Sequence, residues 1–593
     1  MNTKAFLWAT LLALSSCSMP QQPGIDRHAL VIRNNPHVTL VDTLASLSVG
    51  NGRFAFTADV TGLQTFPDSY KNGIPTGTLS KWGHYRSDLS RPFDLGVVGL
   101  ELGREVTPAD LTDIRQTLDL WNGRINSRFV CGDTMFSVLT TCHPELDLVS
   151  AAVVSKSRAG INLRFGLSDS LHTVEVVHFD VHSATLKHTL SGDTTVYYVT
   201  LGWEDEATLS AKEKNYFVLT PKSDTLRFAC LFSVAEPKQT LPAFHETDSV
   251  ATTYRHSFWE EGAAVDFSHC TDPRARELER RVVLSRYLLS IRPDAQWHEQ
   301  AWLGLWGHEA MLDTVLHRYK EANDTVTPHP YLIYMVELFY RARPSANAVT
   351  RYAPLVERVV DSLCLQASYD GVRDRYLLKR EVPAQDSLPA YTLTNPPFEL
   401  SYLRFALQTA QQWRERGELL RRSEWDRLVS KLSMPAYTDY GLYLAAESAV
   451  DTYHNPRYAD GHPMILAAVG LLPMSELIRA DYMRNTLLWA WDNWNWSETQ
   501  GWNYSLVAMN AARLNEPEHA VAALMMRRLG NIYLNNGYNY HNHNLRNGLS
   551  GNGALLVAVA LMCAGWDDCG VVNPGFPKNG TWDVRWEGLK PLP

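Results

Sequence analysis

The chain has 593 residues, of which 45% are apolar and 20% charged, and its formal charge is −9. This length exceeds what one hydrophobic core supports, so we expect two or three globular domains rather than a disordered chain. The acidic balance, without a long cluster of lysines and arginines, argues against nucleic acid as a partner. The 18 tryptophans and 26 tyrosines exceed what a core of this size needs, and flat rings are the side chains that stack on sugars.

The N-terminus has the pattern of an export signal. Lys4 precedes an apolar run at residues 5–14, which suits a signal peptide and is too short to span a bilayer as a helix. The run ends in Leu14-Ser15-Ser16-Cys17, which resembles the bacterial lipobox. We therefore predict a signal peptide at residues 1–16, lipidation of Cys17 and a tether at residues 17–27. The expected location is the cell envelope, in the periplasm or at the outer membrane, with membrane contact through lipid alone; an ordinary cleaved signal peptide is the alternative.

Two kinds of periodicity divide the rest of the chain. Residues 28–269 alternate short β-prone runs with turn signals, which is typical of a β-sandwich. From residue 270 to 593 the pattern is amphipathic and helical, and it predicts an all-α domain. The expected helices cover residues 274–291, 300–319, 330–342, 352–365, 397–416, 462–472, 483–494, 504–514, 517–533 and 552–564.

The eight cysteines indicate no dense disulfide framework, because setting aside Cys17 leaves an odd number. Cys131 with Cys142 and Cys563 with Cys569 are the two pairs that could close in an oxidising compartment. No spacing of cysteine and histidine predicts a zinc site, and we expect no metal and no cofactor.

Several stretches resemble a bacterial group related to glycoside hydrolase family 65. They are LSVGNGRFAF at 47–56, GLQT at 62–65, LGLWG at 303–307, HPY at 329–331, VPAQD at 382–386, TNPPFEL at 394–400, DGHP at 460–463, GWNY at 501–504 and SGNG at 550–553. The resemblance spans nearly the whole mature chain. It implies a β-sandwich joined to an (α/α)6 toroid of the six-hairpin glycosidase type, and an inverting glycosidase that acts on oligosaccharides in carbohydrate metabolism.

Inverting hydrolysis needs a carboxylic acid and a carboxylate base roughly 6.5 to 9.5 Å apart, with water between them. On the resemblance, Asp386 occupies the position of the acid, where the family carries a glutamate. Glu399 is the second catalytic candidate; its place in the first turn of a helix predicts a lowered pKa, which suits a base. The base is otherwise open among Asp460, Asp492 and Glu498, because Asn503 stands where related chains carry aspartate.

The remaining candidates are expected to bind the sugar. They are Trp297, Glu299, Trp306, His329, Asn395, Trp502, Asn503, His541 and Asn552. Two other functions stay open. A disaccharide phosphorylase would cradle phosphate with His541, His543, Ser550 and Asn552, and a catalytically degenerate protein of the same fold would bind glycans without cleaving them.

Overall fold

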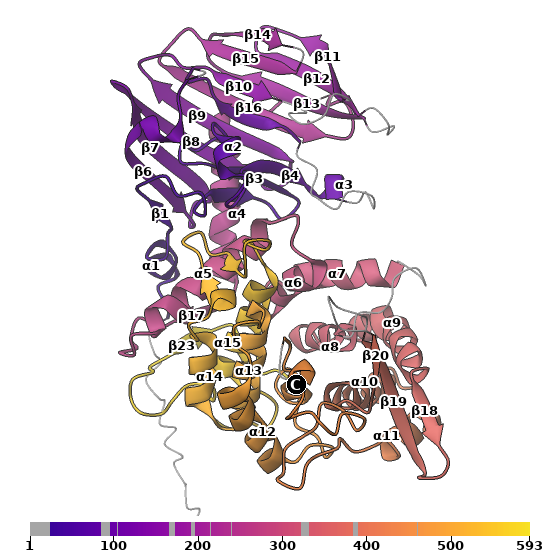
Figure 1. Cartoon of the computed structure of the whole chain (residues 1–593). Helices are drawn as coiled ribbons and strands as arrows, with labels where there is room; N and C mark the ends of the chain where they lie inside the picture. Colours follow the sequence, from indigo (N-terminus) through magenta and orange to yellow (C-terminus); the bar gives the residue numbers. More distant parts are fainter. Residues whose placement is uncertain are drawn as a thin grey trace, which may run out of the picture.

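Strands fill the N-terminal half of the computed structural model, and helices fill most of the remainder (Figure 1). The structure describes residues 24–84, 95–103, 105–164, 172–190, 196–213, 215–238, 240–321, 331–382, 390–458 and 461–593. Cys17 and the predicted signal peptide lie outside these residues, as do His329, Asp386 and Asp460. Within the described part, no helix combines the length and the apolar character that crossing a membrane requires.

The largest element is an antiparallel sheet of nine strands. Its order is β1 (His37–Val38), β6 (Leu111–Asp119), β7 (Arg124–Cys131), β8 (Thr134–Cys142), β9 (Leu148–Ser155), β16 (Thr225–Ser233), β13 (Val196–Trp203), β12 (Ser183–Leu190) and β11 (His172–Phe179). Alternation sets which face is buried: along β7, Ile125, Ser127 and Phe129 point inward between exposed neighbours. Phe129 lies opposite Phe136 of β8, and the two rings stack 5.0 Å apart.

Two smaller sheets complete the β-rich half. One consists of β2 (Leu47–Gly50), β3 (Phe54–Ala58) and β4 (Gly77–Ser80), and the other of β14 (Ala207–Glu213), β15 (Tyr216–Pro221), β10 (Ile161–Arg164) and β5 (Val97–Leu100). Strand β2 contacts β7 and β8, and Phe54 of β3 stacks on Phe232 of β16 with ring centres 5.6 Å apart. The expected β-rich N-terminal half is confirmed.

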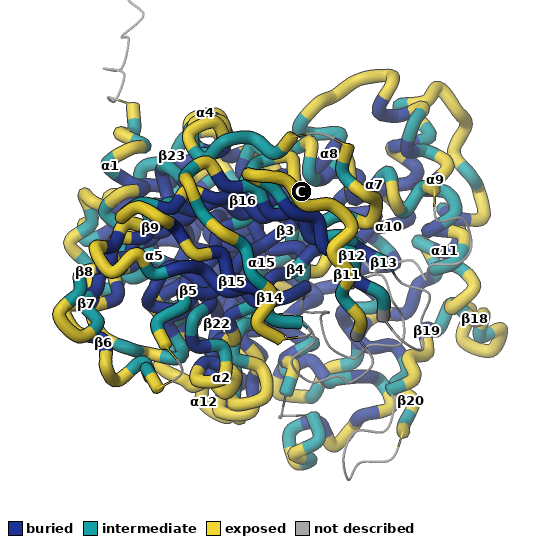
Figure 2. Tube along the Cα trace, turned by 90° about the horizontal axis from the view of Figure 1, so that it is seen from above, coloured by how far each residue is buried: buried dark blue, intermediate teal, exposed yellow. Residues whose placement is uncertain are grey.

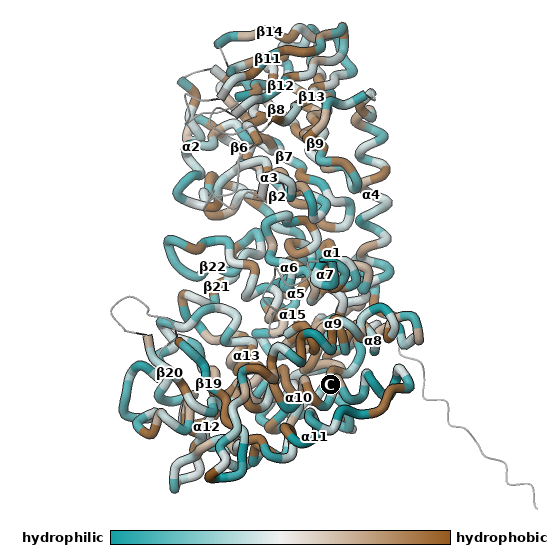
Figure 3. Tube along the Cα trace, turned by 90° about the vertical axis from the view of Figure 1, so that its right-hand side faces the viewer, coloured by the Kyte–Doolittle hydropathy of each residue, from teal (hydrophilic) through white to brown (hydrophobic). Residues whose placement is uncertain are grey.

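A helix that the sequence pattern did not indicate leaves this half. Helix α4 (Phe244–Glu261) contacts β8, β9 and β16 and runs beside the strands toward α1 (Arg27–Ile32) (Figure 3). Its buried positions include Arg255, whose charge hides the amphipathic period. The following strand β17 (Ala264–Asp266) pairs with β23 (Arg585–Glu587), so the C-terminal end of the chain packs against the start of the helical half.

The helical half follows the expected pattern in part. Its longer helices are α5 (Ala275–Ile291), α7 (Glu309–Glu321), α8 (Leu332–Ala342), α9 (Ala346–Cys364), α10 (Pro397–Arg416), α12 (Ala480–Asn493), α13 (Gly501–Arg513) and α15 (Ser550–Ala564), and the shorter ones are α6 (Trp297–Ala301), α11 (Ser423–Ser430) and α14 (Pro517–Leu524). The prediction of a helix at 462–472 is wrong. Only a short 3-10 turn at Leu466–Ala468 forms there, because this segment packs between α10 and α13 as buried, irregular chain.

Three further strands interrupt the helices. They are β18 (Ala367–Asp370), β19 (Arg375–Val382) and β20 (Tyr391–Thr394), which form an antiparallel sheet. One apolar core nevertheless includes buried residues of both halves of the chain. Figure 2 shows the buried segments in dark blue, seen from above.

Neither expected cysteine pair forms, since the seven cysteines of the described residues are free thiols. The register explains the first case. Cys131 pairs with Thr134 beside the β7–β8 turn, whereas Thr141, next to Cys142, pairs with Arg124 at the far end of the hairpin. At about 3.3 Å a residue, the two sulfurs lie roughly 25 Å apart.

The two halves meet where β2 approaches the C-terminal end of α5. Gly50 has no side chain because a Cβ there would come within 2.7 Å of the Ile291 carbonyl oxygen. The amide of Gly52, which adopts a φ of +83°, donates to that same oxygen at 3.1 Å. Arg255 of α4 joins both sides, donating to the Gly50 carbonyl at 2.7 Å and to Ser290 Oγ at 2.8 Å.

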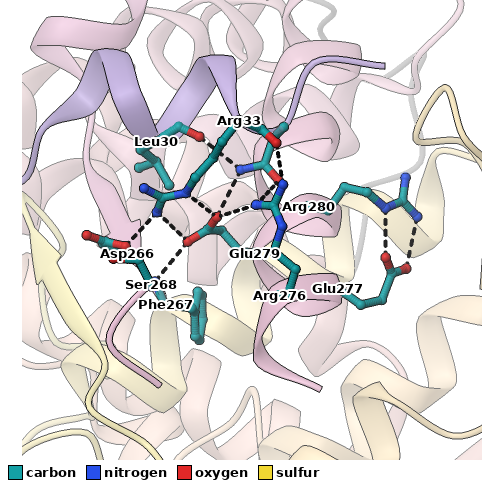
Figure 4. A network of polar contacts seen from close by, with 10 residues as sticks. Leu30, Arg33, Asp266, Phe267, Ser268, Arg276, Glu277, Glu279 and Arg280 are labelled. Carbon is teal, nitrogen blue, oxygen red and sulfur yellow. Dashed lines mark hydrogen bonds and ion pairs between the residues drawn. The ribbon is translucent and has the colours of Figure 1, made fainter. Parts of the chain in front are cut away.

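A buried carboxylate ties α1 to the start of the helical half (Figure 4). Glu279 of α5 is 1% exposed. It accepts hydrogen bonds from Arg33 Nε and Nη2, Asn34 Nδ2, Arg276 Nη1 and the Phe267 amide, at 2.7 to 3.0 Å. Removing this carboxylate would break all five hydrogen bonds, although Arg33, Asn34 and Arg276 each keep a second acceptor.

We therefore predict that Glu279→Ala lowers the free energy of unfolding by about 3–5 kcal/mol, because it removes a buried carboxylate that accepts five hydrogen bonds and leaves Arg33 with Asp266 as its remaining ion-pair partner. Glu415→Ala, near the end of α10, removes an ion pair with Arg421 that stays half in water and should change stability by about 0–1 kcal/mol. Urea denaturation followed by tryptophan fluorescence measures both. Equal losses in the two variants would contradict this account.

Candidate active site

Two adjoining cavities open among the helices. The smaller has a volume of about 230 Å3 and the larger about 620 Å3, and Phe398 and Gln500 line both. The smaller is also lined by His298, Glu299, Trp302, Tyr331, Ala467, Leu471, Trp502, Leu506, Met509, Ser550, Ala554 and Val557. Segments more than 200 residues apart in the sequence thus share one space.

Glu299 is the most distinctive group in the smaller cavity. It lies in the first turn of α6 and is 3% exposed. One carboxylate oxygen accepts the Gln296 amide at 2.8 Å, and the other accepts Ser550 Oγ from the start of α15 at 2.6 Å. The helices come this close because Gly553 has no side chain; a Cβ there would meet Trp302 at 3.1 Å.

Burial raises the pKa of Glu299 to about 7, although both hydrogen bonds favour the charged form. Desolvation is the largest contribution, and no cation is among the groups that shift the pKa. A carboxyl that titrates near neutral pH can either give or take a proton under physiological conditions. Glu299 was predicted only to grip hydroxyls, and its surroundings suit acid–base chemistry as well.

Aromatic side chains form much of the wall around Glu299. Trp302 stands three residues after Glu299, Tyr331 immediately precedes α8, and Trp502 lies in the first turn of α13. The Trp502 ring packs against His462 with centroids 4.8 Å apart. Such faces suit the C–H surface of a sugar ring.

Glu399 lines the larger cavity, at the start of α10. Burial raises its pKa, although the guanidinium of Arg380 donates to one of its oxygens and lowers it. The predicted lowering of this pKa by the helix N-terminus is therefore wrong, because desolvation outweighs both the helix and the cation. The second oxygen is buried without a hydrogen-bond partner.

Asn503 positions a histidine. Its amide nitrogen lies 2.9 Å from Nδ1 of His462, and both residues come from stretches that the resemblance singled out. Burial lowers the pKa of His462, so the ring is neutral; we assign Nδ1 as the acceptor and leave the hydrogen on Nε2. His541 lies near enough to affect this pKa, and burial lowers its own pKa too.

The other predicted binding residues make packing or positioning contacts outside both linings. The Trp306 indole is buried and donates to the Leu556 carbonyl at 3.2 Å. Asn395, at φ +54°, accepts the Leu378 amide and donates to Glu447 in a turn. Asn552 is buried and bonded to Ser285 Oγ, and Trp297 packs edge-on against Tyr319.

The open candidates for the base are likewise separated. Glu498 lines the larger cavity, whereas Asp492 is exposed on α12 outside it. Sequence analysis did not single out Arg380 and Arg457, which also line the larger cavity. Arg380 lies on β19, whose sequence has no regular alternation, so no local signal marked this residue. The Arg457 guanidinium sits 4.7 Å from the Tyr391 ring centre.

Among the residues described, no group of three or more His, Cys, Asp and Glu side chains could hold a metal ion.

Comparison with known proteins gives a structural likeness. No family model and no curated protein matches the sequence. A protein assigned as a kojibiose phosphorylase from the human microbiome superposes with a TM-score of 0.57 and 10% identity, over 89% of this chain and 88% of its own. The likeness covers both halves. The chain shares that protein's fold, a large N-terminal sheet followed by helices.

Two further structures overlap less closely. A bacterial glucoamylase complexed with acarbose has a TM-score of 0.48 and 9% identity, over 89% of this chain and 97% of its own. A family 92 α-mannosidase from Bacteroides thetaiotaomicron has a TM-score of 0.44 and 9% identity, over 89% and 83%.

The raised pKa of Glu299 predicts a pH-dependent stability. Below about pH 4.5 the carboxyl is protonated in both the folded and the unfolded chain. As the pH rises from there through 7, the unfolded chain ionises first and the free energy of unfolding falls. Glu299→Gln should therefore stabilise the protein at pH 8 by an amount on the order of 3 kcal/mol and change little at pH 4.

Thermal melting at the two pH values measures this effect. Glu277→Gln is the matched control: hydrogen bonds and charges from Arg280 and Arg281 outweigh burial and lower the pKa of Glu277. That substitution should destabilise the protein at pH 8, the opposite sign. A Glu299→Gln protein that is less stable than the parent at pH 8 would contradict the assignment.

Proposed function

We propose that this protein is a glycoside hydrolase that cleaves oligosaccharides by inverting acid–base hydrolysis, in a cavity at the centre of an (α/α)6 toroid. One observation carries the proposal. A carboxyl with a pKa near 7 is buried in a cavity walled by Trp302, Tyr331 and Trp502. An acid that protonates a leaving oxygen near neutral pH needs such a pKa, and a pyranose needs such walls.

In this reaction the bond between the anomeric carbon and the glycosidic oxygen breaks, and its electron pair stays on that oxygen, which takes the proton of the acid. Water attacks the anomeric carbon from the opposite face and gives up a proton to the base. We assign Glu299 as the acid. Asp386, the acid implied by the family resemblance, is the rival that the experiments below separate.

Glu399 fits the base better than the acid. Arg380 contacts its carboxylate and favours the charged form, whereas no cation is among the groups that shift the pKa of Glu299. Two carboxyls in adjoining cavities with such different neighbours can hold opposite protonation states at one pH. Glu498, on the wall of the same larger cavity, is the second candidate for the base.

The contacts of the cradle residues favour water over phosphate as the attacking group. Ser550 is bonded to Glu299, and Asn552 is buried against Ser285 and the Gly537 carbonyl. Two of the four side chains that a phosphorylase would need are therefore engaged elsewhere.

A catalytically degenerate glycan-binding protein is the second candidate. It is favoured by Asn503. The resemblance implies an aspartate at this position, and an amide cannot act as a base. The Asn503 nitrogen contacts His462, so this residue has a positioning contact that does not depend on catalysis.

We expect Glu299→Gln to abolish hydrolysis of natural disaccharides while leaving their affinity nearly unchanged, because an amide keeps the shape but cannot protonate the leaving group. Activity should survive better on an aryl glycoside, whose leaving group departs with little protonation. In the parent enzyme, kcat/KM should fall as the pH rises above about 7, where Glu299 loses its proton.

Asp386→Asn tested in parallel decides between the two acids, and Glu518→Gln serves as an exposed carboxylate control. If the loss and the aryl-substrate rescue follow Asp386, the assignment to Glu299 is wrong. If the parent protein binds sugars, hydrolyses none and responds to neither substitution, the degenerate binding protein replaces the enzyme.

We also propose that the mature protein is anchored in the cell envelope by lipid on Cys17. One lipid-modified residue then supplies the membrane affinity, so Cys17→Ala should release the protein into the soluble periplasmic fraction. Cys569→Ala, which alters a thiol in the C-terminal part, should leave fractionation unchanged. Retention of the Cys17→Ala protein in the membrane fraction would reject the anchor.

A further inference from the structure

The β-rich half carries a cavity of its own. This open trough has a volume of about 650 Å3, within the range of ligand sites. Every lining residue precedes α4, so it is built without the helical half: Thr65, Phe66, Pro67, Asp68, Ser69, Leu100, Glu101, Leu102, Gly103, Val106, Thr107, Pro108, Asn162, Arg164, Glu213, Asn215 and Tyr216. Its lining comes from α2 (Pro67–Tyr70) and its flanks and from strands β5, β10, β14 and β15.

Polar side chains on the floor are held in place by one another. Arg164 Nε donates to Asn162 Oδ1 at 3.2 Å, and its Nη2 donates to the Thr65 carbonyl at 3.3 Å. Asn162 in turn donates to the Leu100 carbonyl at 2.9 Å. Across the trough, the Tyr216 hydroxyl donates to Glu101. The trough thus combines hydrogen-bond donors and acceptors in one lining.

The wall on the α2 side is rigid. The buried carboxylate of Asp59 accepts the Thr61 amide, the Thr61 hydroxyl and the Phe66 amide at 2.6 to 2.9 Å. Thr61 Oγ1 also lies 2.7 Å from Thr65 Oγ1. This wall contains GLQT at 62–65, one of the stretches that the helical site does not use. A wall that is held in place before binding loses little conformational entropy when a ligand binds.

The border strand β5 offers no free edge to a peptide. Strand β5 is at the border of its sheet, where peptides often add as a further strand. Here the GLQT stretch covers that border: Val98 N donates to Gln64 Oε1, Val98 O accepts the Gln64 amide, and Leu100 N donates to Thr65 Oγ1. A ligand must therefore be recognised by side chains.

We propose that this trough is a second carbohydrate site, which binds a segment of a neutral oligosaccharide apart from the helical cavities. Sugar hydroxyls both donate and accept hydrogen bonds. They therefore suit a lining in which Glu101 accepts, Arg164 donates and Asn162 can do both. Phe66, Leu102 and Val106 provide apolar surface for the C–H face of the ring. A phosphate or sulfate would have to approach Asp68, Glu101 and Glu213, which disfavour an anion.

Such a site would strengthen the binding of long substrates only. A polymer that occupies both the trough and the helical cavities gains from linked binding, whereas a disaccharide in the helical cavity gains nothing. The inference extends the proposed function but does not rest on it, since the trough can bind glycans even in a protein that cleaves none.

Affinity electrophoresis of the mature full-length protein, in gels containing neutral glucans or mannans, tests the site. The parent should be retarded. Arg164→Met and Glu101→Gln should each weaken this binding roughly tenfold, the effect of losing one hydrogen bond to a charged group. Arg158→Met is the matched control, because Arg158 is exposed on the same half and pairs with Asp224 outside the trough.

Two readouts keep the outcomes apart. Melting temperatures identify a variant that is merely unfolded, and turnover of an aryl glycoside should be unchanged in both trough variants. Glu299→Gln should lose hydrolysis of natural disaccharides and keep its retardation, so failure of the enzyme proposal leaves this one testable. The second site is rejected if no neutral polysaccharide retards the parent, if only acidic ones do, or if Arg164→Met and Glu101→Gln behave like Arg158→Met.

Discussion

The close approach of β2 to the end of α5 is the constraint on which the candidate site depends. Only residues without side chains at positions 50 and 52 let the strand reach the Ile291 carbonyl. The next residue, Arg292, is buried and bound to Asp294 at 2.6 Å and to Thr57 of β3 at 3.1 Å. Its carbonyl accepts the Gln300 side chain at 2.9 Å, which fixes α6.

Glu299, the proposed acid, lies within that short helix, and so the β-rich half positions it although none of that half's described side chains lines either helical cavity. A shift of about 1 Å in a reacting group can reduce a rate a hundredfold. The two halves therefore have to be rigidly joined, and the buried Glu279 carboxylate and Arg255 provide that junction with charged groups that water cannot easily reach.

Electrostatics then divides the two glutamates of the helical cavities. Both are desolvated, and desolvation raises both pKa values. Within the described part of the chain, a cation accompanies Glu399, which can keep its charge, while Glu299 has a hydroxyl and a backbone amide to stabilise its charged form. The same mechanism makes Glu299 a source of instability above neutral pH, which is the usual consequence of burying a functional carboxyl.

The amino-acid sequence by itself determined the elements whose periodicity is strong. Helix α10 begins and ends where the pattern placed it, because Pro397 starts it and an apolar stripe runs to Arg416. The same holds for α5 and for the β-rich first half. Local preference is enough in these cases, since each face is decided by neighbours in the chain.

Tertiary structure alone decided the site. The segment at 462–472 has helical periodicity but stays irregular between two helices, and α4 is helical although a buried arginine conceals its stripe. The pKa of Glu399 is raised although the residue lies at a helix start, because its burial depends on groups distant in sequence. Glu299 and Ser550 are 251 residues apart and meet at 2.6 Å, and only packing of α6 against α15 brings them together.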